Sequence, residues 1–212
     1  MFKRFYHTPL RKRAMDLLLV WPVFLVALPI LVFASIGIYV TMGGPVLFRQ
    51  SRIGINGEVF DIVKFRTMKK TLGPDGVLLD DHLRRHWFGD FLRSTSLDEL
   101  PTLINIAKGD MSFVGPRPLM VKYLPRYSEV QMRRHDVLPG LTGLAQISGR
   151  NCLDWEDKFD LDLEYIEKWS VRLDIQILAE TLKAVTMQVG ADGADLTTEF
   201  MGSGDSVSTG EG

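Results

Sequence analysis

The longest uncharged stretch of the chain sets the first limit on its fold. From Leu17 to Phe48 there is no charged residue. A helix needs roughly 20 apolar residues to cross the hydrocarbon core of a bilayer, so this stretch is long enough to enter one. A cleaved signal peptide fits poorly, because the apolar part is too long and no small-x-small cleavage site follows closely. The sequence therefore predicts a membrane-embedded segment over residues 1–45.

Basic residues around this segment leave its topology open. They flank it on both sides: Arg11, Lys12 and Arg13 before it, and Arg49, Arg52, Lys64, Arg66, Lys69 and Lys70 after it. Cationic flanks favour the cytoplasmic side, so they give a simple spanning helix no clear orientation. A segment that enters and leaves on one face would keep both flanks together, with Pro22 or Pro29 breaking the helix. The alternative is an ordinary spanning helix kinked at a proline.

The soluble part is expected over residues 46–189 and begins with a β-hairpin. Residues 46–53 and 59–68 have the composition of strands, and Asn56-Gly57 between them is a strong hairpin signal. Lys64 and Arg66 stand two apart on the second strand and so point to one face. Two cations on one face suit a diphosphate ligand, and a charged, solubilising strand edge is the alternative.

Several later segments are predicted to be helical. Residues 80–92 and 119–135 mix large apolar side chains with basic ones, which favours amphipathic helices at the membrane surface over helices packed in the core. Residues 154–169 predict a helix, and the apolar residues over 173–189 recur at the spacing of a core-facing helix. Residues 190–212 are mostly Gly, Ser, Thr and acidic residues, which predicts a flexible tail.

The best candidate for chemistry is the adjacent carboxylate pair Asp98 and Glu99. Ser96, three residues before Glu99, fits a capping box, which would make both acids ordinary first-turn residues of a helix. Two features keep a catalytic role open. Pro101 disturbs a regular helix start. Free N–H groups at a helix N-terminus also attract phosphate oxygens and would keep Asp98 ionised as a nucleophile.

Other features narrow the class of protein. Arg117 lies between two prolines and is pre-organised for phosphate, although an ordinary stiff loop has the same pattern. Residues 139–150 are rich in glycine and end in an arginine, but they match neither a Walker loop nor the dinucleotide-binding pattern. The single cysteine, Cys152, excludes an internal disulfide and is interpreted as structural. A formal net charge of -1 gives no reason to expect nucleic acid as a partner.

Four motifs occur in the order of a known family: residues 64–68 (KFRTM), 96–101 (SLDELP), 108–118 (KGDMSFVGPRP) and 139–146 (PGLTGLAQ). Together they make the chain resemble the bacterial sugar transferases known as monotopic phosphoglycosyl transferases, and in particular their small, single-domain members. The resemblance implies an α+β, mostly helical monotopic membrane protein with a re-entrant (broken) N-terminal helix, a short β-hairpin and amphipathic interfacial helices.

The resemblance also implies a reaction and a set of site residues. A sugar phosphate would pass from a UDP-sugar to undecaprenyl phosphate, with release of UMP, through a covalent intermediate. Asp98 would be the nucleophile and a Mg²⁺ ligand, Glu99 its partner, and Arg117 a phosphate ligand. A carboxylate is competent for this attack, because Mg²⁺ neutralises the anionic oxygens of the diphosphate. The further matches to polar, substrate-binding positions are Lys64, Arg93, Arg150 and Asp162.

Membrane topology follows from the resemblance as well. Members of the family insert a helix broken by a Ser-Pro pair, which enters and leaves on the cytoplasmic face of the bacterial inner membrane. Pro29 matches the proline, but Leu28 stands where the serine would be. The proline can still free carbonyls and bend the helix, whereas the hydroxyl bond that would hold the break is missing. The phospholipid bilayer is thus an expected partner.

Two other functions stay open at this point. A membrane-anchored, metal-dependent nucleotide-sugar phosphodiesterase would release UMP without a lipid acceptor, and a non-catalytic membrane adaptor would tolerate the loss of Asp98. The donor sugar is also open. The small size and residues 135–137 and 197–200 resemble members that use an acetamido sugar such as diacetylbacillosamine, with UDP-GlcNAc, UDP-GalNAc and UDP-galactose as alternatives. A homodimer is one alternative for the assembly.

Overall fold

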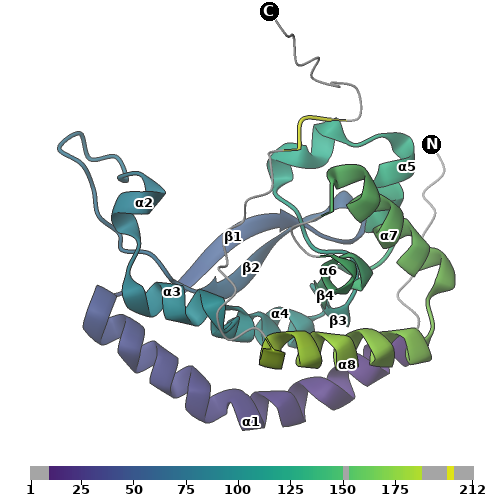
Figure 1. The fold of residues 1–212 in the computed structure, drawn as a ribbon, viewed down its shortest axis with the longest axis horizontal. Coiled ribbons are helices and arrows are strands. Elements are labelled where there is room, and N and C mark those ends of the chain that lie inside the picture. Colours follow the sequence, from purple (N-terminus) through teal and green to yellow (C-terminus); the bar gives the residue numbers. More distant parts are fainter. Residues whose placement is uncertain (1–9, 150–152, 188–199, 203–212) are drawn as a thin grey trace, which may run out of the picture.

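The computed structural model describes residues 10–149, 153–187 and 200–202, which form helices and two two-stranded sheets (Figure 1). This agrees with the predicted mostly helical α+β class. Arg150, Cys152 and nearly all of the tail predicted over 190–212 lie outside the described residues. Phe200 is an exception, because it is 4 % exposed and packs in a cluster with Tyr123 and Phe159. The prediction of a flexible tail is therefore wrong at Phe200.

Helix α1 (Leu10–Met42) runs along one edge of the molecule as a continuous curve (Figure 1). The chain stays helical through both of its prolines, so the break predicted at Pro29 is wrong as an interruption of the helix. Two local effects favour bending instead. Each proline removes a backbone donor, and the hydroxyls of Ser35 and Thr41 donate to carbonyls four residues earlier, at 2.7 and 2.6 Å.

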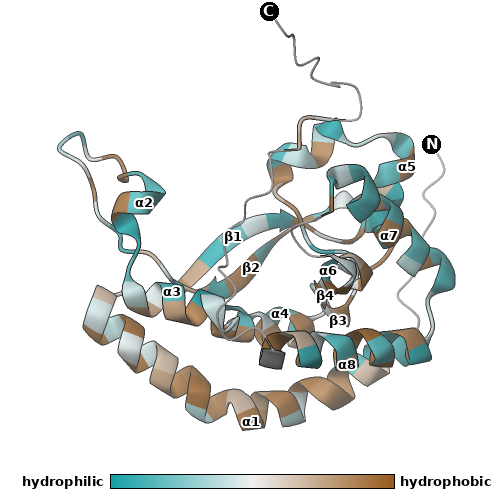
Figure 2. Cartoon of the chain, viewed as in Figure 1, coloured by the Kyte–Doolittle hydropathy of each residue, from teal (hydrophilic) through white to brown (hydrophobic). Residues whose placement is uncertain are grey.

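One side of α1 packs against the rest of the protein and the other is exposed. Its buried residues form a stripe that extends over nearly the whole helix: Lys12, Asp16, Val20, Ala27, Ala34 and Ile38. The remaining surface is largely apolar (Figure 2), with Leu18 and Leu25 more than 70 % exposed. Within the described residues α1 is the helix long and apolar enough to cross a membrane, and only 17 % of its most apolar window is buried. The predicted membrane association is therefore supported by an apolar surface that needs cover.

The predicted hairpin is confirmed. Strands β1 (Leu47–Ile53) and β2 (Val59–Phe65) pair antiparallel, with Leu47 opposite Phe65 and Ile53 opposite Val59. Asn56 and Gly57 both have positive φ, as a two-residue type I′ turn requires.

Arg66 has a structural role that the sequence did not reveal. Its guanidinium donates to the carbonyls of Met42 and Gly43, so it caps the end of α1. The prediction that Lys64 and Arg66 serve one ligand is therefore wrong, because only Lys64 reaches the candidate site described below.

A run of short helices follows the hairpin: α2 (Asp81–Arg84), α3 (Trp87–Ser94), η2 (Leu97–Thr102) and α4 (Leu103–Lys108). The single helix predicted over 80–92 is wrong, since the backbone is extended at Arg85 and His86 between α2 and α3. Helix α3 lies very close to the chain after β2. A Cβ atom at Gly89 would lie 1.8 Å from the carbonyl oxygen of Thr67, so this close approach requires a glycine.

The remaining elements are β3 (Ser112–Val114), η3 (Val121–Arg126), α5 (Glu129–Met132), η4 (Arg133–His135), β4 (Gly140–Thr142), α6 (Leu144–Ser148), α7 (Trp155–Lys168) and α8 (Val171–Met187). The stretch 119–135 forms three short helices, η3, α5 and η4, rather than one amphipathic helix, whereas the helix predicted over 154–169 is confirmed as α7. Helix α8 buries Ile177 but leaves Leu182 68 % exposed, so the core-facing prediction holds only in part. Strands β3 and β4, which were not predicted, pair in parallel.

A buried polar network fixes the start of α1 to α7 and α8. Lys12 and Asp174 are 2 % and 0 % exposed, and Lys12 Nζ lies 2.8 Å from Asp174 Oδ2. The Tyr165 hydroxyl lies 2.9 Å from Lys12 Nζ and 2.8 Å from Asp174 Oδ1, and the Trp169 indole N–H donates to Asp174 at 3.1 Å. One turn further along α1, Asp16 accepts hydrogen bonds from β3. Helix α1 is therefore part of the folded core.

Candidate active site

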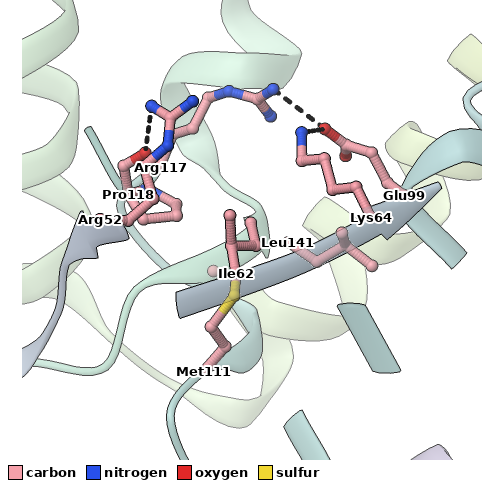
Figure 3. Close-up of a pocket in the computed structure, with 9 residues that line it drawn as sticks. Arg52, Ile62, Lys64, Glu99, Met111, Arg117, Pro118 and Leu141 are labelled. Carbon is pink, nitrogen blue, oxygen red and sulfur yellow. Dashed lines mark hydrogen bonds and ion pairs between the residues drawn. The ribbon is translucent and has the colours of Figure 1, made fainter. Parts of the chain in front are cut away.

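Glu99 lies between two cations that come from distant parts of the chain. Lys64 of β2 places its Nζ 2.6 Å from Glu99 Oε1, and Arg117, in the loop after β3, places its Nη2 3.0 Å from the same oxygen (Figure 3). The fold thus brings together three of the predicted site residues, and Asp98 is adjacent in the chain.

Side chains of η2 and α4 hold this segment against β2. The Thr102 hydroxyl donates to the Val63 carbonyl at 2.9 Å, and Asn105 Oδ1 accepts from the Val63 N–H at 3.0 Å. The Asn105 amide also donates to a second β2 carbonyl at 2.8 Å. Both side chains are buried, and because Val63 precedes Lys64, these bonds set Glu99 opposite Lys64. Sequence analysis missed Asn105, although a lone amide in an otherwise apolar helical turn was an available signal.

The predicted capping box at Ser96 is wrong. Ser96 has a φ of 56°, in the left-handed region, and its side chain makes no cap hydrogen bond with the described residues. The element that follows is a 3-10 helix with Pro101 inside it. Asp98 and Glu99 are therefore not the first-turn acids of a capped α-helix, and the purely structural interpretation of the pair loses its main support.

The two carboxyl groups have opposite pKa shifts. Burial and the neighbouring charge of Glu99 raise the pKa of Asp98 from 3.8 to about 6. Burial would raise the pKa of Glu99 too, but Arg117 and Lys64 outweigh this effect and lower it to about 2. A helix terminus was expected to keep Asp98 ionised; its pKa is instead raised, so that the carboxylate form predominates only above about pH 6. Glu99 stays ionised, and Asp98 titrates near neutral pH.

Asp98 has cations nearby but accepts no side-chain or backbone hydrogen bond from the described residues. The charges of Lys64, Arg117 and Arg93 each favour its ionised form. Arg93, at the end of α3, has its Nη2 3.8 Å from Asp90 Oδ1, and its charge has the smallest of the three effects on the pKa of Asp98. Within the described part of the chain, the Asp98 carboxylate is therefore the acid of the pair that is available to an incoming electrophile.

A pocket adjoins Glu99, with an empty space of about 280 Å³ that includes a part open to solvent. Its lining has an apolar floor and charged or polar walls: Arg52, Ile62, Lys64, Glu99, Met111, Arg117, Pro118, Gly140 and Leu141 (Figure 3). Basic groups above an apolar surface suit a ligand that has both an anionic and an apolar part.

Asp162 does not line this pocket. It is 3 % exposed, and its Oδ2 accepts hydrogen bonds from Nε and Nη2 of Arg134 at 3.1 and 2.7 Å. Nη2 of Arg134 also donates to the backbone carbonyl of Arg117 at 2.8 Å. The predicted direct contact between Asp162 and substrate therefore does not fit this geometry. Asp162 supports the site indirectly, since it holds Arg134 and Arg134 holds the Arg117 backbone. The position of Arg150 lies outside the described residues.

The acidic pair fits Mg²⁺ as a site shared with substrate. Among the described residues there is no group of three or more His, Cys, Asp or Glu side chains that could hold a metal ion. Mg²⁺ commonly binds through one or two carboxylates plus substrate phosphates, so a dedicated protein cage is not required. Burial, and after it the neighbouring charge of Glu99, raises the pKa of Asp98; a bound cation would offset both effects, while Glu99 is already engaged by Lys64 and Arg117. Asp98 is therefore the better candidate ligand.

The fold and the site define a membrane-associated protein in which an acidic pair stands among cations, an arrangement suited to phosphoryl chemistry. The sequence matches the model of the bacterial sugar transferase family over residues 7–188. This chain belongs to the bacterial sugar transferase family, as the motif resemblance predicted, and is a transferase.

Curated relatives share much of the sequence. The chain is 46% identical to the uncharacterized sugar transferase EpsL of Bacillus subtilis, over 83% of this chain and 88% of the relative. It is 41% identical to the UDP-glucose:undecaprenyl-phosphate glucose-1-phosphate transferase of Escherichia coli, over 84% of this chain and 42% of the relative. It is 36% identical to the undecaprenyl-phosphate galactose phosphotransferase of Salmonella typhimurium, over 85% of this chain and 41% of the relative. The chain thus spans less than half the length of the last two.

Proposed function

We propose that this protein transfers a sugar 1-phosphate from a UDP-sugar to undecaprenyl phosphate and releases UMP. The observation that carries the proposal is the difference between the two adjacent acids. Glu99 forms ion pairs with Lys64 and Arg117, while Asp98 has no ion pair with the described residues. The names of the Escherichia coli and Salmonella relatives, which specify undecaprenyl phosphate, support the same reaction class. A site beside a membrane-associated helix also suits one water-soluble and one lipid substrate.

The proposed chemistry runs in two displacements at one phosphorus atom. An ionised Oδ of Asp98 attacks the phosphorus that bears the sugar, and the bond from that phosphorus to the oxygen of UMP breaks, so UMP leaves with the electron pair. A phosphate oxygen of undecaprenyl phosphate then attacks the same phosphorus. The bond to Asp98 breaks, the carboxylate is restored, and the sugar remains on a polyprenyl diphosphate.

The neighbouring residues stabilise charge during both steps. Lys64 and Arg117 face the phosphate oxygens, where fixed cations lower the energy of the developing charge. Glu99 holds these two cations in position, because both contact its Oε1. Mg²⁺, held by Asp98 and the diphosphate, would neutralise the phosphate oxygens and favour departure of UMP.

A direct assay tests the proposed function. Purified protein in detergent or nanodiscs is mixed with Mg²⁺ and single UDP-sugars, including UDP-glucose, UDP-galactose, UDP-GlcNAc, UDP-GalNAc and UDP-diacetylbacillosamine. UMP release that depends on undecaprenyl phosphate, together with a lipid-linked product, is the expected result for one or more donors. Equal UMP release with and without the lipid would instead identify a phosphodiesterase, and no release from any donor would reject the enzyme assignment.

The rate should depend on pH through Asp98. The ionised carboxylate is the nucleophile, so activity is present above the pKa of Asp98 and is lost as pH falls through about 6. The value of kcat/KM for the donor at limiting Mg²⁺ should therefore be half-maximal near pH 6, and the midpoint should move lower as Mg²⁺ rises. The unfolding temperature over the same range is the control. A flat profile through pH 6 in a stably folded sample would contradict the role of Asp98.

We further propose that α1 enters and leaves the bilayer on the cytoplasmic face of the bacterial inner membrane. Near its start, Lys12 pairs with Asp174, and at its end Arg66 binds the carbonyls of Met42 and Gly43. Both ends are thus tied to polar groups of one domain, and the buried stripe runs between them. A helix of this length is about 50 Å long, well over the roughly 30 Å hydrocarbon core, so a spanning orientation would separate its two ends across the membrane.

Cysteine accessibility tests this topology. In a Cys152→Ser background, Leu10→Cys and Thr41→Cys lie near opposite ends of α1, and both should react with a membrane-impermeant maleimide from the same side of sealed vesicles. Phe33→Cys, within the exposed apolar surface of α1, is the matched control and should react slowly from either side. Labelling of the two terminal positions from opposite sides would show that α1 spans the membrane.

A further inference from the structure

Arg52 marks the end of the pocket that lies away from the acidic pair. It stands on β1, and its Nη1 and Nη2 donate to the Pro118 carbonyl at 3.4 Å and to Gln50 Oε1 at 2.6 Å. Figure 3 shows Arg52 beside Pro118 on one side of the pocket and Lys64 with Glu99 on the other. The pocket therefore carries positive charge at both ends.

The backbone fixes Arg52 in this place. The end of β1 is joined to the chain after Pro118 by a bridge between Arg52 and Met120 and by a hydrogen bond from the Ile53 N–H to the Leu119 carbonyl at 3.1 Å. These contacts attach the hairpin to the same loop that carries Arg117. Arg52 and Arg117 consequently keep a fixed relation to each other, which pre-organises two guanidinium groups for one ligand.

Charge balance indicates what this ligand is. Among the described residues that line the pocket, the cations Arg52, Lys64 and Arg117 outnumber the one carboxylate, Glu99, which favours an anionic ligand. The diphosphate of a nucleotide sugar carries two negative charges at neutral pH. Because Lys64 and Arg117 stand at the end next to Asp98, they face the phosphate that bears the sugar, and Arg52 is left to face the other one.

The apolar floor of the pocket is suited to the nucleoside part of such a ligand. Ile62, Met111 and Leu141 lie beneath the gap between the two charged ends (Figure 3). A ribose and a flat pyrimidine base can cover such a surface, whereas a hydrated sugar gains little from it. In a UDP-sugar the second phosphate links the reacting phosphorus to the ribose, so it lies between the reacting centre and the nucleoside.

We propose that Arg52 binds the α-phosphate of the donor, which leaves as the phosphate of UMP, and that Ile62, Met111 and Leu141 contact the uridine. This inference rests on the proposed function, because it assumes a UDP-sugar donor. It assigns the nucleotide half of the substrate to β1 and the pocket floor, and it makes Arg52 a substrate-binding residue in addition to Lys64 and Arg117.

Binding of UMP tests the inference. UMP is titrated into purified full-length protein by calorimetry, with wild type compared to Arg52→Gln and Arg52→Lys. Loss of a charged hydrogen bond should raise the Kd for UMP roughly 10-fold or more in Arg52→Gln, and by less in Arg52→Lys, which keeps the charge but loses the planar fork. Steady-state assays should show the same rise in KM for the UDP-sugar.

Arg49→Gln is the matched control, since it removes one positive charge from the same strand at an exposed position three residues away, on the opposite face. Its Kd for UMP should equal that of wild type. An unchanged Kd for UMP in Arg52→Gln would overturn the inference, and so would an equal rise of the Kd in Arg49→Gln. If Arg52→Gln does not fold, a Kd for UMP in Arg52→Lys equal to that of wild type would overturn it. These outcomes are distinct from failure of the proposed function, in which wild type itself would release no UMP.

Discussion

Asp98→Asn is expected to lower lipid-dependent UMP release at least about 10³-fold. The amide has the size of the carboxylate but is not a competent nucleophile, so the first displacement cannot occur. Asp98 accepts no hydrogen bond from the described residues, and Asn also removes the repulsion with Glu99, so the fold should be retained. The measurement is UMP release, combined with intact-mass spectrometry of protein quenched after mixing with donor alone. Wild type should gain the mass of a sugar phosphate, and Asp98→Asn should not.

Asp61→Asn provides the control for this substitution. Asp61 is exposed on β2, where its Oδ1 accepts a hydrogen bond from Ser51, and it precedes Lys64 by three residues, so it lies on the other face of the strand. Its activity and mass adduct should match those of wild type. An Asp98→Asn protein that still forms the adduct would show that another group is the nucleophile, and retained turnover would support a non-covalent route.

Lys12→Met is expected to destabilise the protein by about 3–5 kcal/mol. The substitution leaves the carboxylate of Asp174 buried without its cation, and desolvation of an unpaired charge is costly. Tyr165 and Trp169 still donate to Asp174, but hydrogen bonds from neutral groups replace only part of the lost interaction. The measurement is the midpoint of thermal or denaturant unfolding in a defined detergent, compared with wild type.

Two further variants separate the ion pair from general effects on charge. Lys168→Met removes the cation of an exposed pair with Glu164 and should leave the midpoint nearly unchanged. Lys12→Met combined with Asp174→Leu removes both buried charges and should recover much of the stability that Lys12→Met loses. A midpoint of Lys12→Met equal to that of wild type would show that the pair is not buried in the membrane-bound protein.

Local patterns predicted the elements that carry their own signals. The Asn-Gly turn identified the hairpin of β1 and β2, and the helix predicted over residues 154–169 is α7. Strands β3 and β4 are only three residues each, too short for any periodicity, and they meet because Gly115 and Gly140 allow their backbones to approach closely. The prediction of one helix over 80–92 was wrong because the backbone is extended at Arg85 and His86. The amphipathic pattern of the sequence continues through these two residues, so it does not reveal the interruption.

The candidate site was predictable only where motifs mark it. Asp98 and Glu99 were found as adjacent acids, but their different charge states depend on Lys64 and Arg117, which the fold brings from other segments. The Ser96 capping pattern was misleading, because a left-handed residue at this point turns the chain into a 3-10 helix. Arg134 was missed for a different reason: nothing in the sequence distinguishes a buried arginine from the exposed ones around it.

The buried stripe of α1 has a consequence for how the protein can be divided. Ala34 and Ile38 share a hydrophobic cluster with Phe65, Phe88 and Leu92, residues of the hairpin and of the helix that leads into the active site. Removing residues 10–42 would uncover that cluster and leave Asp174 without Lys12. The apolar helix therefore cannot be exchanged for another anchor or trimmed away to give a soluble enzyme. Helix α1 thus combines an exposed apolar surface with a face that forms part of the core around the candidate active site.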